Sequence, residues 1–350
     1  MLSFIVFIFI LSVLVLSHEA GHFFLARFFG IRVEEFGFGL PPRVFSVTRK
    51  GIVYSLNLLP FGGFVKIFGE EGEDRADAAS FSSKPARQRA LVLAAGVVAN
   101  LLLAYLVFSW ASLLGVPEAL SDAEAKLAPD AYVAITEIAP ASPAAFAGLM
   151  AGDKILNFKI VSEFQIFVNE NRGKEIDVSL ERGGEILNKR LLARANPPEG
   201  AGALGVALAA LRLKKAYWYQ APWGGALLTW DAFLGTVYGL YGAMRDLFLG
   251  RAGQIEVAGP VGIFSLTSLV LRLGLSTFLI FLALLSINLA ILNVLPIPGL
   301  DGGRLAFLLF EVIRGKPISQ KIGFWAHSIG LALLILLMIL VTYRDIASFF

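Results

Sequence analysis

Long apolar runs separated by short polar segments dominate the pattern of hydrophobic and polar positions along this chain of 350 residues. Four regions predict helices long enough to cross a hydrocarbon core about 30 Å thick. They lie at residues 1–26, 90–115, 259–303 and 323–343, and the apolar part of the third is Leu273–Leu295. The pattern therefore predicts a polytopic α-helical membrane protein with four transmembrane helices.

The composition agrees with a membrane protein and excludes several other classes. Hydrophobic residues make up 57% of the chain and charged residues 16%, and the mean hydropathy is +0.72. A soluble globular domain carries more charge than this. The net charge of +3 is small, and the basic residues are scattered, so no nucleic acid is expected as a partner. The chain has no cysteine, which excludes disulfides and thiol nucleophiles.

The segment 27–89 is rich in Lys and Arg, and the positive-inside rule therefore predicts that it is cytoplasmic. Gly37–Pro42 breaks any helix here, and Val44–Val47, Ile52–Leu58 and Phe64–Phe68 have the pattern of short strands. We predict a membrane-associated, re-entrant β-hairpin region. It either offers a strand edge to an extended substrate or serves only as an interfacial anchor.

Residues 127–208 have the composition of a soluble domain inserted between the second and third spans. Tyr132–Ile138 predicts a strand, and Ser142 followed by Pro143 predicts the start of a short helix. A hairpin is expected from two further strands, Ile176–Glu181 and Ile186–Leu192. The segment is therefore predicted to be a small inserted α/β domain.

Within the segment 209–258, Gly224–Met244 is apolar enough to span a membrane, but the region also contains aromatic residues typical of a membrane interface. Among them are Trp223, Trp230, Tyr238 and Tyr241. We predict interfacial amphipathic helices here. An extra membrane crossing would place Asp301 on the membrane face opposite His18 and His22, and these three residues are candidate ligands of one metal ion. Residues 304–322 contain Arg and Lys and are predicted to be a second cytoplasmic loop.

The strongest chemical signal is His18-Glu19-Ala20-Gly21-His22, at the end of the first apolar run. On a helix, residues four apart lie on one face, so both imidazoles can reach one metal ion. This H-E-x-x-H pattern is typical of zinc peptidases, with the glutamate as general base. A third ligand is needed, and the candidates are His327 and carboxylates, among which Asp301 is favoured beside its apolar span. The alternative is a pair of surface histidines.

Three motifs together resemble one known family. They are H-E-A-G-H, the run S-P-A-A-F-A-G-L-M-A-G-D-K-I-L at 142–156, and N-V-L-P-I-P-G-L-D-G-G at 293–303. The second motif closely resembles PDZ domains of bacterial proteases. With all three, nearly the whole chain resembles the site-2 protease family, in its bacterial RseP- and RasP-like branch with one PDZ domain. Arg304 is a departure, because this branch often has His at that position.

The resemblance implies a zinc metalloendopeptidase that holds one Zn²⁺ per chain through His18, His22 and Asp301, with Glu19 catalytic. It also implies a set of residues that handle substrate. These are Asn293, Pro296 and Pro298 near the third span, and Gly62, Gly63 and Phe64 in the hairpin region.

The resemblance further implies substrates and a location. The substrates would be single-span membrane proteins, such as anti-sigma factors and signal-peptide remnants, cut in regulated intramembrane proteolysis. The enzyme would lie in the lipid bilayer of the bacterial inner membrane, with the active site toward the cytoplasm. The PDZ domain would be extracytoplasmic and would bind a ligand such as a protein C-terminus. Two alternatives are a catalytically silent PDZ adaptor and a metal transporter, although transporters usually contain internal repeats.

Overall fold

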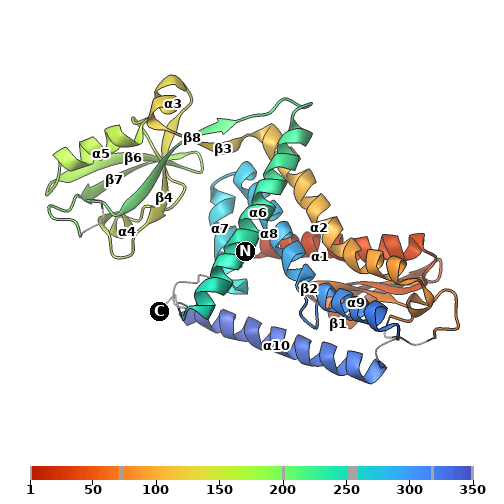
Figure 1. The fold of residues 1–350 in the computed structure, drawn as a ribbon. Coiled ribbons are helices and arrows are strands. Elements are labelled where there is room, and N and C mark those ends of the chain that lie inside the picture. Colours follow the sequence, from red (N-terminus) through yellow and green to blue (C-terminus); the bar gives the residue numbers. More distant parts are fainter. Residues whose placement is uncertain are drawn as a thin grey trace. The chain divides into compact units, whose positions relative to one another are not determined.

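The computed structural model describes residues 2–70, 72, 74–198, 202–250, 259–316 and 319–347. These residues form two compact units (Figure 1). The helical unit comprises Met1–Ser109, Pro222–Ser268 and Leu279–Phe350, and the sheet unit comprises Trp110–Ala221 and Leu269–Phe278. The helical unit contains the H-E-x-x-H motif, and the sheet unit contains the predicted inserted domain.

Four helices of the described chain are long and apolar enough to cross a membrane. They are α1 (Leu2–Phe28), α2 (Ala86–Leu114), α8 (Leu275–Val294) and α10 (Gln320–Ala347). Their number and order agree with the sequence prediction. Much of their surface is exposed and apolar, as expected for helices whose solvent is lipid.

Three further helices accompany these spans: α6 (Ala221–Phe248), α7 (Pro260–Arg272) and α9 (Asp301–Arg314). In the segment 209–258 the structure has the end of a strand and then one helix, α6, while residues 251–258 lie outside the described part. Thr236 of α6 donates a hydrogen bond to Asn288 of α8 at 3.1 Å, so α6 lies against a spanning helix.

The expectation that 304–322 is a loop was wrong for its first half, because α9 continues through Arg314. The physical reason is an apolar face on this segment. Leu308 is buried in a cluster with Ala26 of α1 and Val92 of α2, and Leu305 packs against the same cluster. Tertiary packing of this amphipathic face stabilises the helix. The basic residues of the segment had suggested a loop instead.

The hairpin region forms two long bent strands rather than three short ones, β1 (Val33–Arg49) and β2 (Ile52–Ile67). Residues 33–38 of β1 pair with 53–56 of β2 on one side and with 63–67 on the other. The segment 63–67 is therefore an edge of this small sheet. Large apolar side chains near the tip are exposed, as a hairpin in contact with lipid requires. They include Leu40, Val44, Phe45 and Leu58.

The sheet unit is built on a six-stranded sheet with the order β3-β8-β4-β5-β6-β7. The strands are β3 (Val116–Leu120), β4 (Tyr132–Ile138), β5 (Lys154–Ile155), β6 (Glu175–Arg182), β7 (Glu185–Leu192) and β8 (Val206–Lys214). Its helices are α3 (Asp122–Leu127), α4 (Pro143–Phe146) and α5 (Val161–Glu170). The predicted strand 132–138, the Ser142 cap and the hairpin are all present, since the Ser142 hydroxyl accepts from Ala145 N at 3.2 Å.

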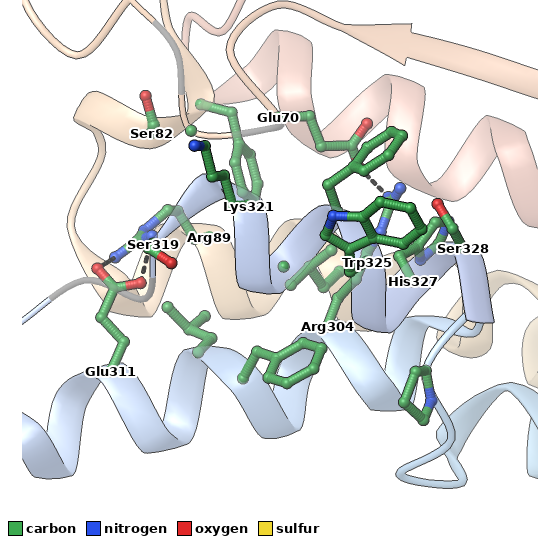
Figure 2. A pocket seen from close by; sticks show the side chains of 18 of the residues that line it. Glu70, Ser82, Arg89, Arg304, Glu311, Ser319, Lys321, Trp325, His327 and Ser328 are labelled. Carbon is green, nitrogen blue, oxygen red and sulfur yellow. Dashed lines mark hydrogen bonds and ion pairs between the residues drawn. The ribbon is translucent and has the colours of Figure 1, made fainter. Parts of the chain in front are cut away.

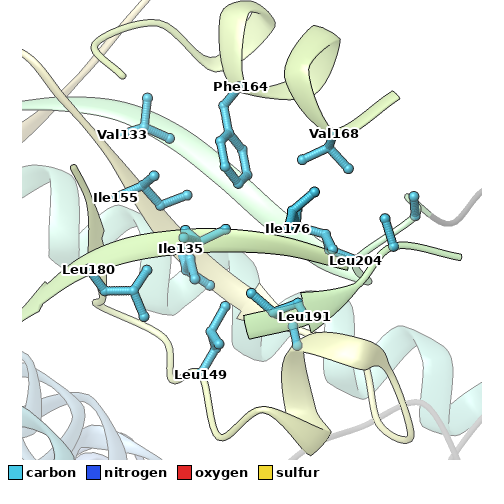
Figure 3. Packing of buried hydrophobic residues seen from close by; sticks show 14 residues of the cluster. Val133, Ile135, Leu149, Ile155, Phe164, Val168, Ile176, Leu180, Leu191 and Leu204 are labelled. Atoms are coloured by element: carbon cyan, nitrogen blue, oxygen red, sulfur yellow. The ribbon is translucent and has the colours of Figure 1, made fainter. Parts of the chain in front are cut away.

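Two features of the sheet unit differ from the prediction. The sheet begins at Val116, before the expected boundary at 127, because β3 pairs with β8 far along the chain. Helix α5 was not predicted, and Phe164 and Val168 on its inner face pack onto the buried side of the sheet (Figure 3). Residues 199–201, within the expected domain, lie outside the described part.

A buried ion pair stabilises the turn at Gly152 and Asp153 in the sheet unit. Asp153 is fully buried and accepts two hydrogen bonds from Arg182, from Nε and Nη2, both at 2.6 Å. The carboxylate also accepts from Met150 N at 2.9 Å. The hydrogen bond to Asp153 raises the pKa of the Arg182 guanidinium. Removal of either side chain would therefore leave the other as an unpaired charge in the interior.

We predict that Arg182→Met destabilises the sheet unit by about 3–5 kcal/mol, because the Asp153 carboxylate would remain buried without its cation. The measurement is thermal unfolding of the purified full chain, combined with limited proteolysis of the sheet unit. Arg190→Met is the matched control, since Arg190 forms an exposed pair with Asp177 on the hairpin. Equal unfolding temperatures for the two variants would contradict the role given to Arg182.

Candidate metal centre

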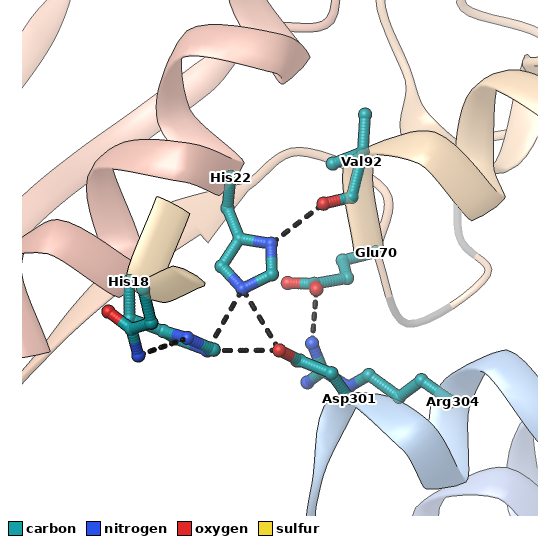
Figure 4. A network of polar contacts seen from close by, with 7 residues as sticks. His18, His22, Glu70, Val92, Asp301 and Arg304 are labelled. Carbon is teal, nitrogen blue, oxygen red and sulfur yellow. Dashed lines mark hydrogen bonds and ion pairs between the residues drawn. The ribbon is translucent and has the colours of Figure 1, made fainter. Parts of the chain in front are cut away.

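Helix α1 presents His18 and His22 one turn apart, and both side chains are buried. The third group, Asp301, is the first residue of α9. The chain reaches it through residues 295–300, where two prolines prevent α8 from continuing. The carboxylate thus arrives at the histidine pair from a different helix (Figure 4).

The three side chains point their ligand atoms at one another. Asp301 Oδ2 lies 2.9 Å from His18 Nε2 and 3.1 Å from His22 Nε2, and the two Nε2 atoms are 3.3 Å apart. Zinc bonds of about 2.0–2.1 Å in a tetrahedron give ligand atoms separated by about 3.3 Å. Two imidazole nitrogens and one carboxylate oxygen are also a donor set that zinc binds. These residues therefore fit a zinc ion.

A glycine on α2 keeps the space around these atoms open. A Cβ added at Gly96 would lie 2.8 Å from His18 Nε2 and would overlap His22 Nε2. Gly21 on α1 acts in a similar way, because its Cβ would collide with the carbonyl of Ala95. The two glycines let α1 and α2 approach closely at the level of the histidines.

Helix α2 also contacts the far side of each histidine ring. His22 Nδ1 donates to the carbonyl oxygen of Val92 at 2.8 Å. A carbonyl can only accept, so Nδ1 carries a proton and Nε2 is the nitrogen that would bind the metal. His18 Nδ1 lies 3.4 Å from the side-chain nitrogen of Asn100, which is completely buried. The signal in the sequence for this contact is the position of Asn100 four residues after Gly96, on the same helix face.

The hairpin edge passes beside the glutamate of the motif. A Cβ at Gly63 would lie 3.7 Å from Glu19 Cγ and 3.1 Å from a methyl group of Val15 on α1. Phe64 lies over Gly37, and Gly62 has a positive φ of 101°. The structure therefore brings Gly63, one of the three predicted substrate residues of the hairpin, next to Glu19.

The other predicted substrate residues lie on the connection from α8 to α9. Asn293 is half-buried near the end of α8, and Pro296 is exposed. The carbonyl of Pro298 packs tightly against Gly330 of α10. Within the described part of the chain, no hydrogen bond joins Asn293 to the residues of the metal cluster.

His327, the rejected candidate for the third ligand, lies outside the cluster. It lines a cavity of about 480 Å³ between α2, α9 and α10 (Figure 2). Two ion pairs cross this region: Glu70 with Arg304, and Arg89 with Glu311 at 2.9 Å. Arg304 is one turn beyond Asp301, so its contact with Glu70 anchors the start of α9. No local sequence signal pairs these charges.

Comparisons with known proteins agree with this geometry. The sequence profile described as peptidase family M50 matches residues 6–337. A putative zinc metalloprotease of Clostridium perfringens is 34% identical over 341 residues, covering 96% of each chain. The zinc metalloprotease RasP of Oceanobacillus iheyensis is 30% identical over an alignment of 446 positions, covering all of each chain. The regulator of sigma-W protease RasP of Bacillus subtilis is 30% identical over 431 positions, covering 99% of this chain and 98% of its own.

We predict that Gly96→Ala weakens zinc binding about tenfold or more, because the new methyl group would occupy the space between the two imidazoles. Alanine favours a helix more than glycine does, so the loss would not come from a weakened helix α2. Zinc affinity of the purified chain, measured by competition with a chelator, tests this. Val98→Ala, on the exposed face of the same helix, is the control and should bind zinc normally.

Proposed function

The chain belongs to peptidase family M50 and is a zinc metalloprotease, and from this premise we propose that it hydrolyses peptide bonds inside the membrane-spanning segments of single-span proteins. The observation that carries the proposal is the mutual distance of three ligand atoms on helices α1 and α9. Helix α1 is one of the four helices able to cross a membrane, so chemistry at His18 and His22 takes place at membrane depth.

The proposed zinc ligands are His18, His22 and Asp301, for one Zn²⁺ per chain. When bound, zinc polarises a carbonyl group and acidifies water. Val92 accepts the Nδ1 proton of His22 and so leaves Nε2 as the nitrogen for the metal. Ionisable groups in an apolar surrounding are costly unless they are paired, and here each of the three groups contacts the other two.

Glu19 is proposed as the general base, since it follows His18 directly and its side chain extends toward the hairpin edge. Its carboxylate accepts a proton from the attacking water as the water oxygen forms a bond to the scissile carbonyl carbon. The same carboxyl group then donates that proton to the amide nitrogen as the C–N bond breaks. Atoms balance, since one water is consumed and a carboxyl group and an amine are formed.

A substrate helix conceals its peptide bonds behind intrahelical hydrogen bonds, so it must unwind before hydrolysis. We propose that the edge segment 63–67 of β2 receives the unwound backbone by strand addition, with Gly62, Gly63 and Phe64 at the contact. Asn293 offers a side-chain amide to the freed backbone groups. Pro296 and Pro298 keep the neighbouring connection irregular and accessible.

The proposed substrates are anti-sigma factors and signal-peptide remnants, in regulated intramembrane proteolysis. The name of the Bacillus subtilis relative, regulator of sigma-W protease, supports the anti-sigma factors among these substrates. We further propose that the protein lies in the bacterial inner membrane. The Lys and Arg residues between α1 and α2 favour a cytoplasmic location for the hairpin side of the metal centre, which leaves the sheet unit extracytoplasmic.

The sheet unit is proposed to be a PDZ domain that binds a protein C-terminus. A cavity of about 240 Å³ lies between α5 and the segment that enters β8. Apolar side chains line it, including Phe164, Val168, Leu204 and Val206. Beside it, β3 covers β8 only from Ala210 onward, so the first part of β8 has an edge for an added strand.

We predict that Asn169→Trp weakens binding of a peptide with an apolar C-terminal residue by about tenfold or more, because the ring would fill the cavity. Fluorescence anisotropy with the full chain measures this, and an amidated peptide should bind poorly even to the wild type. The control is Ile166→Trp, on the exposed face of α5 away from the cavity. Equal binding by both variants would contradict the proposed groove.

We predict that Glu19→Gln retains zinc but lowers cleavage of a single-span reporter by about 10²-fold or more, because the amide cannot take up the proton of water. Asp301→Ala should instead lose zinc, as should the wild type after treatment with a chelator. Metal analysis and gel-based cleavage assays measure both effects. Glu185→Gln, exposed at the start of β7, is the control. A Glu19→Gln variant that cleaves normally would refute the mechanism.

A further inference from the structure

One stripe of α2 faces both histidine rings. Val92, Gly96 and Asn100 follow one another at intervals of four residues and therefore lie on one helix face. Val92 contacts His22, Asn100 contacts His18, and Gly96 leaves room between the rings. The Asn100 side chain thus occupies, for His18, the place that a backbone carbonyl occupies for His22.

The proposed zinc ligand set requires a particular tautomer of His18. Its Nε2 lies 2.9 Å from Asp301 Oδ2, so Nε2 is the atom that would bind the metal. A neutral imidazole that ligates through Nε2 carries its proton on Nδ1, and that N–H needs an acceptor. The atom facing Nδ1 at 3.4 Å is the amide nitrogen of Asn100, which can only donate.

The side-chain oxygen of Asn100 provides a second observation. Its Oδ1 is buried and has no hydrogen-bond partner among the described residues. The nitrogen and oxygen of an asparagine side chain exchange places by a half-turn of its terminal torsion, and their assignment follows from the hydrogen-bond network. A half-turn places Oδ1 opposite the Nδ1–H of His18. In the described orientation, by contrast, the proton of His18 would sit on Nε2 and block the metal.

We propose that Asn100 is a positioning residue whose Oδ1 accepts the Nδ1–H of His18 and holds this ring in the tautomer that binds zinc. The proposal rests on the zinc ligand set proposed above. Asn100 is itself anchored, since its backbone oxygen accepts from the Ser286 hydroxyl of α8 at 2.8 Å, and both side chains are fully buried. Asn100 therefore links α1 to α8, the helix that precedes Asp301.

The first test compares zinc affinities of full-length variants in detergent by competition with a chelator. Asn100→Leu has nearly the same shape but cannot accept a hydrogen bond, and we expect zinc binding about 10–100-fold weaker than in the wild type. Asn100→Asp restores an acceptor and should bind zinc nearly as tightly as the wild type. Val98→Ala, on the exposed face of α2, touches neither ring, and it should leave zinc affinity unchanged.

The second test reads the tautomer directly. The chain has only three histidines, so selective ¹⁵N-histidine labelling gives an assignable NMR spectrum of the zinc-loaded protein. The wild type should show Nδ1 protonation for both His18 and His22. In Asn100→Leu the Nδ1–H resonance of His18 should shift and exchange faster because it has lost its acceptor, while the Nδ1–H resonance of His22, which depends on Val92, should stay as in the wild type. A general disturbance of the helices would alter both rings together.

Several outcomes would overturn the proposal. One is wild-type zinc affinity in Asn100→Leu, and another is an equal loss of affinity in Val98→Ala. If Asn100→Leu does not fold, zinc binding tenfold weaker than wild type in Asn100→Asp would refute the role. Asp301→Ala separates the two levels of inference. If Asp301→Ala still binds zinc, the proposed ligand set is wrong. If Asp301→Ala loses zinc but the Asn100 variants bind zinc as the wild type does, the ligand set stands and the positioning role is wrong.

Discussion

The contact of one carboxylate with two imidazoles, in the interior of an apolar helical unit, is the constraint on which the rest of the structure depends. Each group is expensive to bury alone, and the distances of 2.9–3.3 Å between their ligand atoms let each offset the cost of the others. The helices must therefore pack closely at this level. Gly21 and Gly96 meet that need, because a methyl group at either position would collide with α2 or with the histidines.

The same region brings an open strand edge to Glu19, the proposed general base. An intramembrane protease needs water, an acid–base group and an extended peptide at one place, although a bilayer favours none of the three. In this chain the edge segment 63–67 runs past Glu19, and the prolines near 296–298 end α8 so that Asp301 can start a new helix. Irregular backbone is tolerated here because it is packed against protein, as the contact of Pro298 with Gly330 shows.

Ion pairs on the loop side hold α9, and therefore Asp301, in position. Arg304 pairs with Glu70 one turn beyond Asp301, and Arg89 of α2 makes two hydrogen bonds to Glu311 farther along the same helix. The Arg89–Glu311 pair is largely shielded from solvent, where a charge-assisted contact is stronger than at a surface. Arg304 departs from the histidine that is frequent in the resembling branch, and this structure gives it a definite partner.

The sequence by itself determined whatever is local. Four apolar runs have the length of a membrane span, and a spacing of four residues puts His18 and His22 on one helix face; both follow from the dimensions of the α-helix. Turn and cap residues likewise predicted β4, α4 and the β6–β7 hairpin. Only the tertiary structure decided the pairings between distant segments: Asp301 with His22 across 279 positions, Asn100 with His18 across 82, and Arg304 with Glu70 across 234. The helical character of α9 and the pairing of β3 with β8 belong to the same group. Such contacts depend on how apolar faces pack, and no short stretch of sequence encodes that arrangement.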